Sequence, residues 1–271
     1  MIATLRATTP DGAAVGARVA SPASVDPAAT TLVFVHGVGS TAAIWDPQLE
    51  AFGGEYRCLA VELRGNGACT PDPEPSLVTR SGFAQDVLTV LDRARVDRFT
   101  LVGCSLGGVV AFELWERADR RFEATVILGS FARYPDGQRY ADAIAAAVRE
   151  AGSMRVFAER RAVQLGLPPN RYAATIEQMA CKSVSCYLAA TQATWTGDYR
   201  SMLASIAAPV LVAYGRHDKV APRALSEEIA AGIPSAVLAE IPDAGHVANA
   251  DNPAAFNAIL RDFLKRPDVL R

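Results

Sequence analysis

Short apolar runs alternate with amphipathic stretches along this chain. The apolar runs are rich in Val, Leu and Ile, which is typical of strands that are buried on both faces of a sheet. The stretches between them place apolar residues at helical spacing, and this alternation predicts a parallel sheet with helices on both faces. The predicted strands cover residues 31–36, 56–61, 99–103, 124–128, 209–214 and 236–241. The clearest predicted helices cover residues 106–117, 223–231 and 252–265.

Two parts of the chain depart from this alternation. Residues 2–7 and 15–20 predict an antiparallel pair of strands at the edge of the sheet. Residues 131–206 have a helical pattern throughout and contain no convincing strand. A helical insertion between two parallel strands would lie above the sheet as a cap. We therefore expect an α/β core formed by residues 1–130 and 207–271, with residues 131–206 as a helical cap inserted in it.

Composition narrows the possible partners and the compartment. The chain has 271 residues and a net charge of −2, so no general field attracts nucleic acid or an anionic membrane. No apolar run is long enough to predict a membrane span, and residues 1–10 lack the apolar stretch of a secretory signal. The five cysteines have no paired CxxC spacing, which favours reduced thiols and a cytoplasmic location. No oligomeric state is predicted.

A candidate nucleophile lies between a predicted strand and a predicted helix. Residues 103–107 read GCSLG and match the pattern G-x-S-x-G. In this context Ser105 would occupy a sharp turn, with its hydroxyl above the carboxyl ends of the strands, where ligands bind in open α/β sheets. The flanking glycines would be needed because a Cβ atom would collide with neighbouring backbone.

A serine hydroxyl needs a base, and the chain has three histidines. His246 follows the last predicted strand and precedes the closing helix, so it lies at the carboxyl end of the sheet. His36 ends a strand and is better suited to bracing the next turn, and His217 has no glycine-loop context. By elimination, His246 is the predicted base.

The base in turn needs a carboxylate that fixes its tautomer and stabilises the imidazolium. Asp218 follows the strand at 209–214 and faces the same end of the sheet. Asp243 is a rival because it is three residues from His246, but its position suits bracing a turn. We favour Asp218, which gives the chain order Ser105, Asp218, His246. The backbone N–H groups of Leu106 and Val38 are the predicted oxyanion donors.

These motifs, together with the histidine–glycine pair at 36–37 and the sequence AGH at 244–246, resemble the α/β-hydrolase superfamily. The resemblance covers essentially the whole chain, and it implies an α/β-hydrolase fold with a mostly parallel central sheet. Residues 103–110, 147–154 and 244–256 are most similar to the 3-oxoadipate enol-lactonase branch and to related small capped lactonases and esterases. The resemblance implies a serine hydrolase.

The chain departs from this pattern in one loop. Relatives usually carry D-x-R-G-H-G-x-S after the second core strand, whereas residues 62–69 read ELRGNGAC. Three polar positions therefore differ close to the predicted oxyanion turn, at Glu62, Asn66 and Cys69. The departures leave the triad intact and bear on substrate choice.

The working hypothesis is hydrolysis of a small-molecule ester or lactone by water, through an acyl-enzyme on Ser105. An alternative with the same triad is cleavage of a carbon–carbon bond in a β-diketone or a meta-cleavage-type substrate. A third reading is a signalling receptor that binds and slowly cleaves a small ligand. No metal or organic cofactor is expected, since no HxH, HExxH or strand-linked GxGxxG pattern occurs.

The predicted cap also supplies candidate substrate contacts. Arg133, Arg160 and Trp195 could face Ser105 and would suit a carboxylated substrate. Other apolar residues of the cap could line the pocket or pack the cap against the core, and the pattern does not separate these two roles for any one of them.

Overall fold

A computed structural model describes residues 2–24, 29–66, 72–117, 121–165, 167 and 169–269. These residues form an eight-stranded sheet in the order β1-β2-β4-β3-β5-β6-β7-β8. β1 and β2 are antiparallel, β2 is antiparallel to β4, and every later pair is parallel. The strands are β1 (Ala3–Thr8), β2 (Ala14–Ala20), β3 (Thr31–Val35), β4 (Cys58–Glu62), β5 (Phe99–Cys104), β6 (Phe122–Leu128), β7 (Val210–Gly215) and β8 (Ala236–Ile241). The expected mostly parallel sheet with an antiparallel edge pair is confirmed.

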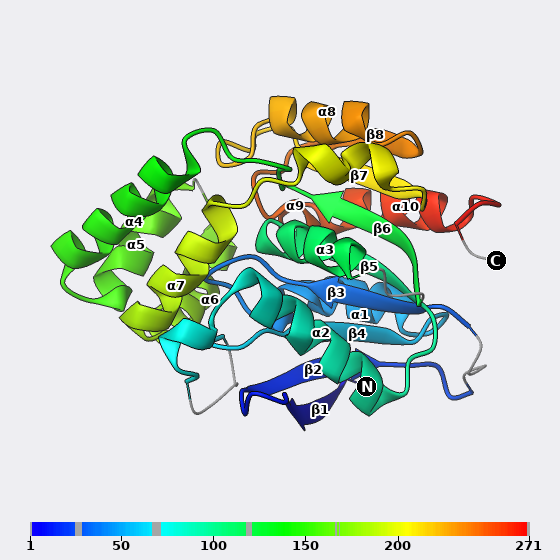
Figure 1. The fold of residues 1–271 in the computed structure, drawn as a ribbon, viewed down its shortest axis with the longest axis horizontal. Coiled ribbons are helices and arrows are strands. Elements are labelled where there is room, and N and C mark those ends of the chain that lie inside the picture. The colour runs from blue at the N-terminus through cyan, green and yellow to red at the C-terminus, as the bar shows by residue number, and fades with distance from the viewer. Residues whose placement is uncertain are drawn as a thin grey trace.

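Helices cover both faces of the sheet (Figure 1). In β3, Val33 and Val35 pack into one apolar core, whereas Leu32 and Phe34 pack into the other, as the strand period of two requires. The first core includes α2 (Arg80–Ala94), α3 (Leu106–Glu116) and α8 (Arg223–Gly232). The second includes the 3₁₀ helix η1 (Ala42–Trp45) with α1 (Asp46–Phe52), α9 (Ala248–Asp251) and α10 (Pro253–Leu264). A second short 3₁₀ helix, η2 (Pro75–Leu77), precedes α2.

Between β6 and β7 the described residues form helices and contribute no strand to the sheet. They are α4 (Gly137–Ala151), α5 (Met154–Gln164), α6 (Pro169–Ala180), α7 (Val184–Trp195) and the 3₁₀ helix η3 (Arg200–Ser205). The helices α4 to α7 gather at one end of the molecule, on the left in Figure 1, whereas η3 packs against α8. Below, "the cap" means this segment, residues 131–206.

Serine side chains begin two of the cap helices. The hydroxyl of Ser153 accepts a hydrogen bond from Val156 N–H at the start of α5, and that of Ser183 accepts one from Cys186 N–H at the start of α7. Each satisfies one of the N–H groups that a helix leaves unpaired at its first turn. The short connections between cap helices thus carry their own stop and start signals.

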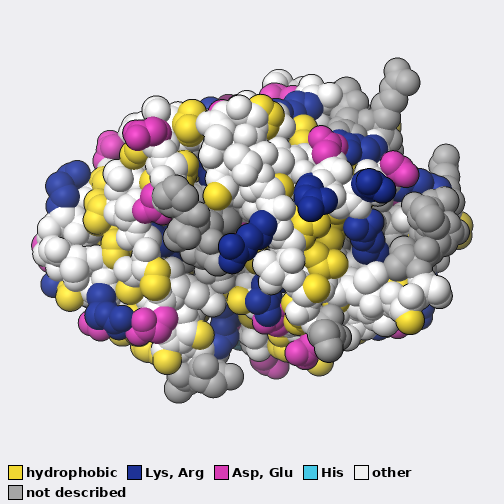
Figure 2. Space-filling model, turned by 90° about the horizontal axis from the view of Figure 1, so that it is seen from below, with side chains coloured by type: hydrophobic (Ala, Val, Ile, Leu, Met, Phe, Trp, Pro, Cys, Tyr) yellow, Lys and Arg dark blue, Asp and Glu magenta, His cyan; other side chains and the backbone are white. Residues whose placement is uncertain are grey.

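The surface carries both signs of charge. On the face shown in Figure 2, Lys and Arg side chains are intermixed with Asp and Glu side chains, and hydrophobic side chains lie between them. Of the helices in the described part of the chain, none is long and apolar enough to cross a membrane. The cysteines at 58, 104, 181 and 186 are free thiols, and Cys69 lies outside the described residues.

Candidate active site

Ser105 occupies the single residue between β5 and α3. Its backbone has φ 54° and ψ −111°, a conformation that side-chain-bearing residues rarely adopt. Two hydrogen bonds hold it there: Ser105 N–H donates to Leu128 O at 2.9 Å, and Ser130 Oγ donates to Ser105 O at 2.8 Å. The surrounding structure therefore fixes a strained turn, as the G-x-S-x-G pattern predicts.

The glycines of this turn are required by close backbone approach. A Cβ atom at Gly103 would lie 2.2 Å from Gly107 O, and one at Gly107 would lie 2.3 Å from Val35 O. Both distances are far below van der Waals contact with backbone atoms that cannot move away. Any larger residue at either position would displace β3, β5 or the start of α3.

His246 and Asp218 come together beside this turn. His246 Nδ1 lies 2.9 Å from Asp218 Oδ2, and the Asp218 side chain is fully buried. Asp218 Oδ1 accepts hydrogen bonds from Val220 N–H at 2.8 Å and Ala221 N–H at 2.9 Å. A carboxylate held in this way favours the proton on Nδ1 and leaves Nε2 free to accept one.

The three rivals lie elsewhere. His36 is buried, its Nδ1 lies 2.8 Å from Gly37 O, and Leu63 N–H donates to its Nε2, so it braces the turn after β3. His217 and Asp243 are exposed and line a separate shallow groove.

An apolar cavity joins the candidate residues. Ser105, His246 and Val38 all line it, and it holds about 740 Å³ of space free of protein atoms, its opening to solvent included. Most of the remaining lining is apolar and comes from both the core and the cap, including Ile44, Ile144, Leu165, Met179, Tyr187 and Trp195. Among the described residues, no hydrogen bond links the Ser105 hydroxyl to the His246 ring, and such contacts often tighten only with substrate.

The turn after β3 passes directly beside Ser105. Ser40 N–H donates to Gly37 O at 3.2 Å, and Gly39 has φ +76°, which favours glycine. A Cβ atom built on Gly37 would lie 3.2 Å from Ser105 Cβ, so this backbone touches the nucleophile. Within the described part of the chain, neither Val38 N–H nor Leu106 N–H donates to another residue. Both donors are therefore unused by the described residues.

Comparison with known proteins agrees with this architecture. Residues 32–259 match the model of the alpha/beta hydrolase family. The chain belongs to this family. Like the relatives that share its fold, it is a hydrolase.

Three similar proteins indicate the range of activities among relatives. A protein of Azorhizobium caulinodans that is named as the carbamate hydrolase RutD is 28% identical over 87% of this chain and 91% of its own. The 3-oxoadipate enol-lactonase 2 of Acinetobacter baylyi is 27% identical over 87% of this chain and 88% of its own. The crystal structure of the enol-lactonase from Burkholderia xenovorans LB400 is 25% identical, with a TM-score of 0.85, and the match covers 96% of this chain and 100% of that one. The activities named for these relatives are thus carbamate hydrolysis and enol-lactone hydrolysis.

The predicted substrate contacts of the hydrolase are partly corrected by their placement. Trp195 is buried and lines the cavity, as expected. Arg133 does not line it: its side chain is half exposed and pairs with Asp198 at 3.8 Å, beside a short bridge between the two ends of the cap. Arg160 does not line it either, because it lies on the outer face of α5 and pairs with Glu150 at 2.9 Å.

Sequence reasoning missed the neighbouring residue Arg161, which does line the cavity. Its position on α5 agrees with this placement. Phe157, Ala158 and Ala162 of α5 are buried, and a residue three or four positions after the first two shares their face. Arg161 has this spacing from both Phe157 and Ala158, whereas Arg160 has it from Phe157 alone.

The departure at Asn66 is matched by a residue of the cap. Asn66 Oδ1 accepts a hydrogen bond from Lys182 Nζ at 2.8 Å, and Lys182 Nζ also donates to Ser40 O at 3.0 Å. Lys182 is buried in the connection between α6 and α7. It therefore ties the cap both to the loop after β4 and to the turn that carries Val38.

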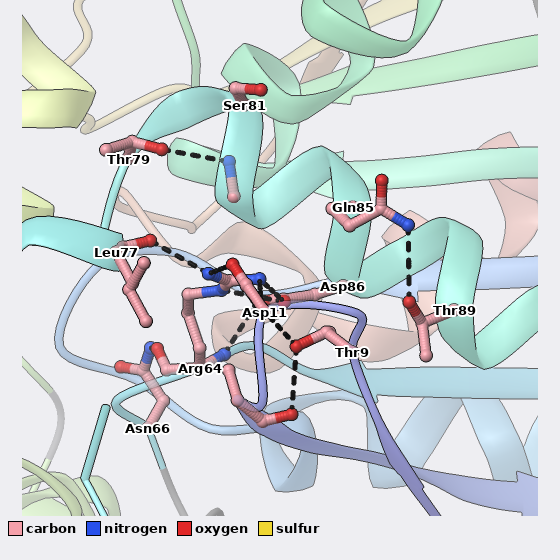
Figure 3. A network of polar contacts seen from close by, with 12 residues as sticks. Thr9, Asp11, Arg64, Asn66, Leu77, Thr79, Ser81, Gln85, Asp86 and Thr89 are labelled. Carbon is pink, nitrogen blue, oxygen red and sulfur yellow. Dashed lines mark hydrogen bonds and ion pairs between the residues drawn. The ribbon is translucent and has the colours of Figure 1, made fainter. Parts of the chain in front are cut away.

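The same loop is fixed from behind by buried charges (Figure 3). Arg64 is completely buried, and it pairs with the buried Asp86 of α2 and with the half-exposed Asp11 of the β1–β2 hairpin, at 2.7 Å in each case. Asn66 Nδ2 donates to Arg64 O at 2.9 Å. A continuous polar chain thus runs from the core helix α2 to the turn beside Ser105.

Proposed function

We propose that this hydrolase cleaves a carboxylic ester or lactone of a small molecule through an acyl-enzyme on Ser105. The observation that carries the proposal is the meeting of three features at one apolar cavity. These are a serine held in a strained turn, a histidine paired with a buried carboxylate, and two backbone donors beside the serine. Relatives named as enol-lactonases support the substrate class.

In the first half of the proposed reaction, Ser105 Oγ forms a bond to the carbonyl carbon while His246 Nε2 takes its proton. The carbonyl oxygen becomes an oxyanion that accepts hydrogen bonds from Val38 N–H and Leu106 N–H. When the carbon–oxygen bond to the alcohol breaks, His246 gives the proton to the leaving oxygen. Asp218 stabilises the charged imidazolium throughout.

In the second half, water attacks the acyl carbon and gives a proton to His246. The bond to Ser105 then breaks, and His246 returns the proton to Ser105 Oγ. The product is a carboxylic acid, and the enzyme regains its starting state.

Ser105 is favoured over its neighbour Cys104, which also lines the cavity. Burial raises the pKa of the Cys104 thiol, so it stays protonated at neutral pH. A protonated thiol is a poor nucleophile. Cys104 Sγ also lies 3.8 Å from His246 O, a backbone atom, rather than beside the imidazole ring.

The test is steady-state hydrolysis of p-nitrophenyl acetate, p-nitrophenyl butyrate, a γ-lactone, an enol-lactone, an aryl carbamate and a β-diketone. We expect turnover of esters or lactones, reduced by several orders of magnitude in Ser105→Ala because triad members act as a unit. Turnover near wild type in Ser105→Ala, activity confined to the β-diketone, or a reaction that stops after one equivalent would each contradict the proposal.

A matched pair of variants tests the acid. Asp218→Asn removes the carboxylate that contacts His246, whereas Asp243→Asn removes the exposed rival. We expect kcat to fall by about 10⁴-fold in the first variant, by analogy with loss of the correct histidine tautomer. The second variant should retain wild-type kcat. The reverse result would move the role to Asp243.

A further inference from the structure

Three cationic residues of the cap reach the active-site region, and two of them have protein partners there. Arg171 Nη1 lies 2.5 Å from Asp251 Oδ1 and donates to Val247 O. Lys182 donates to Ser40 O and to Asn66 Oδ1.

The third cation, Arg161, lines the cavity as Arg171 does, but it lacks the carboxylate partner that Arg171 has. Its hydrogen bond is to a neutral group, the hydroxyl of Tyr140, at 3.0 Å. It forms no ion pair with any described carboxylate. The neighbouring phenols do not supply a negative charge in place of a carboxylate. Burial raises the pKa of Tyr134 and of Tyr187 to about 12, so both phenols are neutral at neutral pH. The positive charge of Arg161 therefore faces an apolar cavity without a protein counter-ion.

A second donor, which lacks a partner in the described part of the chain, belongs to another residue of the cavity lining. Trp195 is 2% exposed and lines the cavity, and its indole Nε1–H has no hydrogen-bond partner among the described residues. Buried indole N–H groups usually have a partner. The ring centroids of Trp195 and Tyr140 are 4.5 Å apart, and Tyr140 is the residue that holds Arg161. The cation and the orphan donor thus belong to one cluster.

We propose that Arg161, assisted by Trp195, binds a carboxylate of the substrate on the cap side of the cavity, away from the carbonyl that Ser105 attacks. The inference rests on the proposed function, and it narrows the substrate to an ester or lactone that also carries a free carboxylate. A guanidinium matches a carboxylate geometrically, because two parallel N–H groups can donate to its two oxygens.

The charge balance favours a monoanion. Arg161 is the one cation of the described cavity lining that lacks a counter-ion, since Arg171 is already paired with Asp251. A phosphate monoester would bring nearly two negative charges and would leave one uncompensated beside apolar walls, which is costly. A carboxylate brings one.

The kinetic test compares an anionic ester with a neutral ester of similar length, mono-p-nitrophenyl glutarate and p-nitrophenyl pentanoate. We expect wild type to prefer the anionic ester by at least about tenfold in kcat/KM, the scale of a charge-assisted hydrogen bond. In Arg161→Gln this ratio should fall by about 10- to 100-fold. Arg160→Gln is the matched control, because it removes the adjacent exposed arginine, and its ratio should equal that of wild type.

Trp195→Phe keeps an aromatic ring and removes the N–H, so it should lower the ratio by a smaller factor of about three to ten. The proposal is overturned if wild type shows no preference for the anionic ester, or if the ratio is the same in Arg161→Gln as in wild type. A loss of both substrates in equal proportion would also overturn it, since that result indicates a structural role.

A binding measurement separates this inference from the proposed reaction. Hexanoate, a monocarboxylate, is titrated calorimetrically into wild type, Arg161→Gln and Arg160→Gln. Binding at least about tenfold weaker in Arg161→Gln alone would support the carboxylate site even if no ester in the panel were turned over. Equal affinity in all three proteins would exclude the site, whatever the esterase results.

Discussion

Replacing Asp86 by Asn should lower the free energy of unfolding by about 3 kcal/mol, the range for breaking a buried ion pair. Asp86 and Arg64 both have completely buried side chains. Asp86 Oδ1 accepts from Arg64 Nε at 2.8 Å, and Asp86 Oδ2 accepts from Arg64 backbone N–H at 2.9 Å. The substitution preserves the shape of the side chain and removes its charge, so the effect is electrostatic.

The magnitude follows from what Arg64 loses and what it keeps. Removing one partner of a buried pair costs about 3–5 kcal/mol, because the other charge is left without compensation. Arg64 keeps hydrogen bonds to Asp11 Oδ2 at 2.7 Å and to Leu77 O at 2.9 Å, which places the loss at the lower end of that range. An Asn side chain has one oxygen acceptor and one N–H₂ donor, so it can accept only one of the two hydrogen bonds that Asp86 accepts from Arg64. At the other contact, two N–H donors would face each other.

The assay is urea unfolding followed by circular dichroism, with the free energy taken from linear extrapolation at matched slope. Asp11→Asn is the control, because the Asp11 side chain is 37% exposed and its pair with Arg64 should contribute only about 0–1 kcal/mol. If Asp86→Asn were no less stable than Asp11→Asn, burial would not set the strength of this network, and the reasoning would fail.

Three further predictions concern the turns around the site and the response to acid. Lys182→Met should lower kcat about tenfold with a smaller change in KM, because the Lys182 side chain positions the turn that carries the proposed oxyanion donor Val38. Lys182→Arg should recover part of the lost kcat. Equal kcat in both variants and in wild type would contradict this prediction. Gly103→Ala should lower the free energy of unfolding by about 3 kcal/mol, since the new Cβ atom would lie 2.2 Å from a backbone oxygen. The control is Gly54→Ala, whose Cβ atom would have no neighbouring atom within 4 Å. In the same unfolding assay this control should lose less than about 1 kcal/mol. Arg64 lowers the pKa of Asp11 to about 2, so the stability that Asp11 contributes should be present above about pH 4 and vanish as pH falls toward 2. The difference in unfolding free energy between wild type and Asp11→Asn, measured from pH 7 to pH 2, checks the sign.

The centre of the sheet could be predicted because strands β3, β5 and β7 are buried on both faces. All five residues of β3 are buried, so apolar residues are favoured at every position of the strand. The strand is therefore a near-continuous apolar run that is easily recognised in the sequence. The turn at Ser105 was predictable for a related reason. Gly103 and Gly107 are fixed by backbone contact and not by side-chain packing, so the spacing of glycines around a serine reports the geometry directly.

The cap could be predicted as helical, but not in the detail that decides specificity. Arg160 and Arg161 are adjacent in sequence, and only the second lines the cavity. The buried face of α5 is narrow, because the inward residues Phe157, Ala158 and Ala162 are interleaved with charged ones. A weakly amphipathic helix of this kind leaves its orientation to tertiary packing, which a pattern of single residues does not report.

Lys182 was likewise invisible before the structure, since a lone lysine in a helical segment normally indicates a solvated position. Its burial depends on two acceptors that lie 142 and 116 residues away in the chain, Ser40 O and Asn66 Oδ1. Such contacts need the fold to be known first. The altered loop at Asn66 is joined to the turn that carries Val38 through Lys182, and this cap residue is the part that sequence could not supply.

Two cations of the cap, Lys182 and Arg171, contact different loops beside the cavity. Lys182 holds the turn with the proposed oxyanion donor Val38, whereas Arg171 binds Asp251 and Val247 O beside the proposed base His246. Asp251 Oδ2 also accepts from the N–H of Gly245 at 2.9 Å, so one carboxylate holds both the cap and the residue before His246. The groups that would carry out the chemistry are therefore positioned partly by the segment that closes the cavity. A change in the cap that alters substrate fit should for this reason also alter kcat, because the two properties share the same contacts.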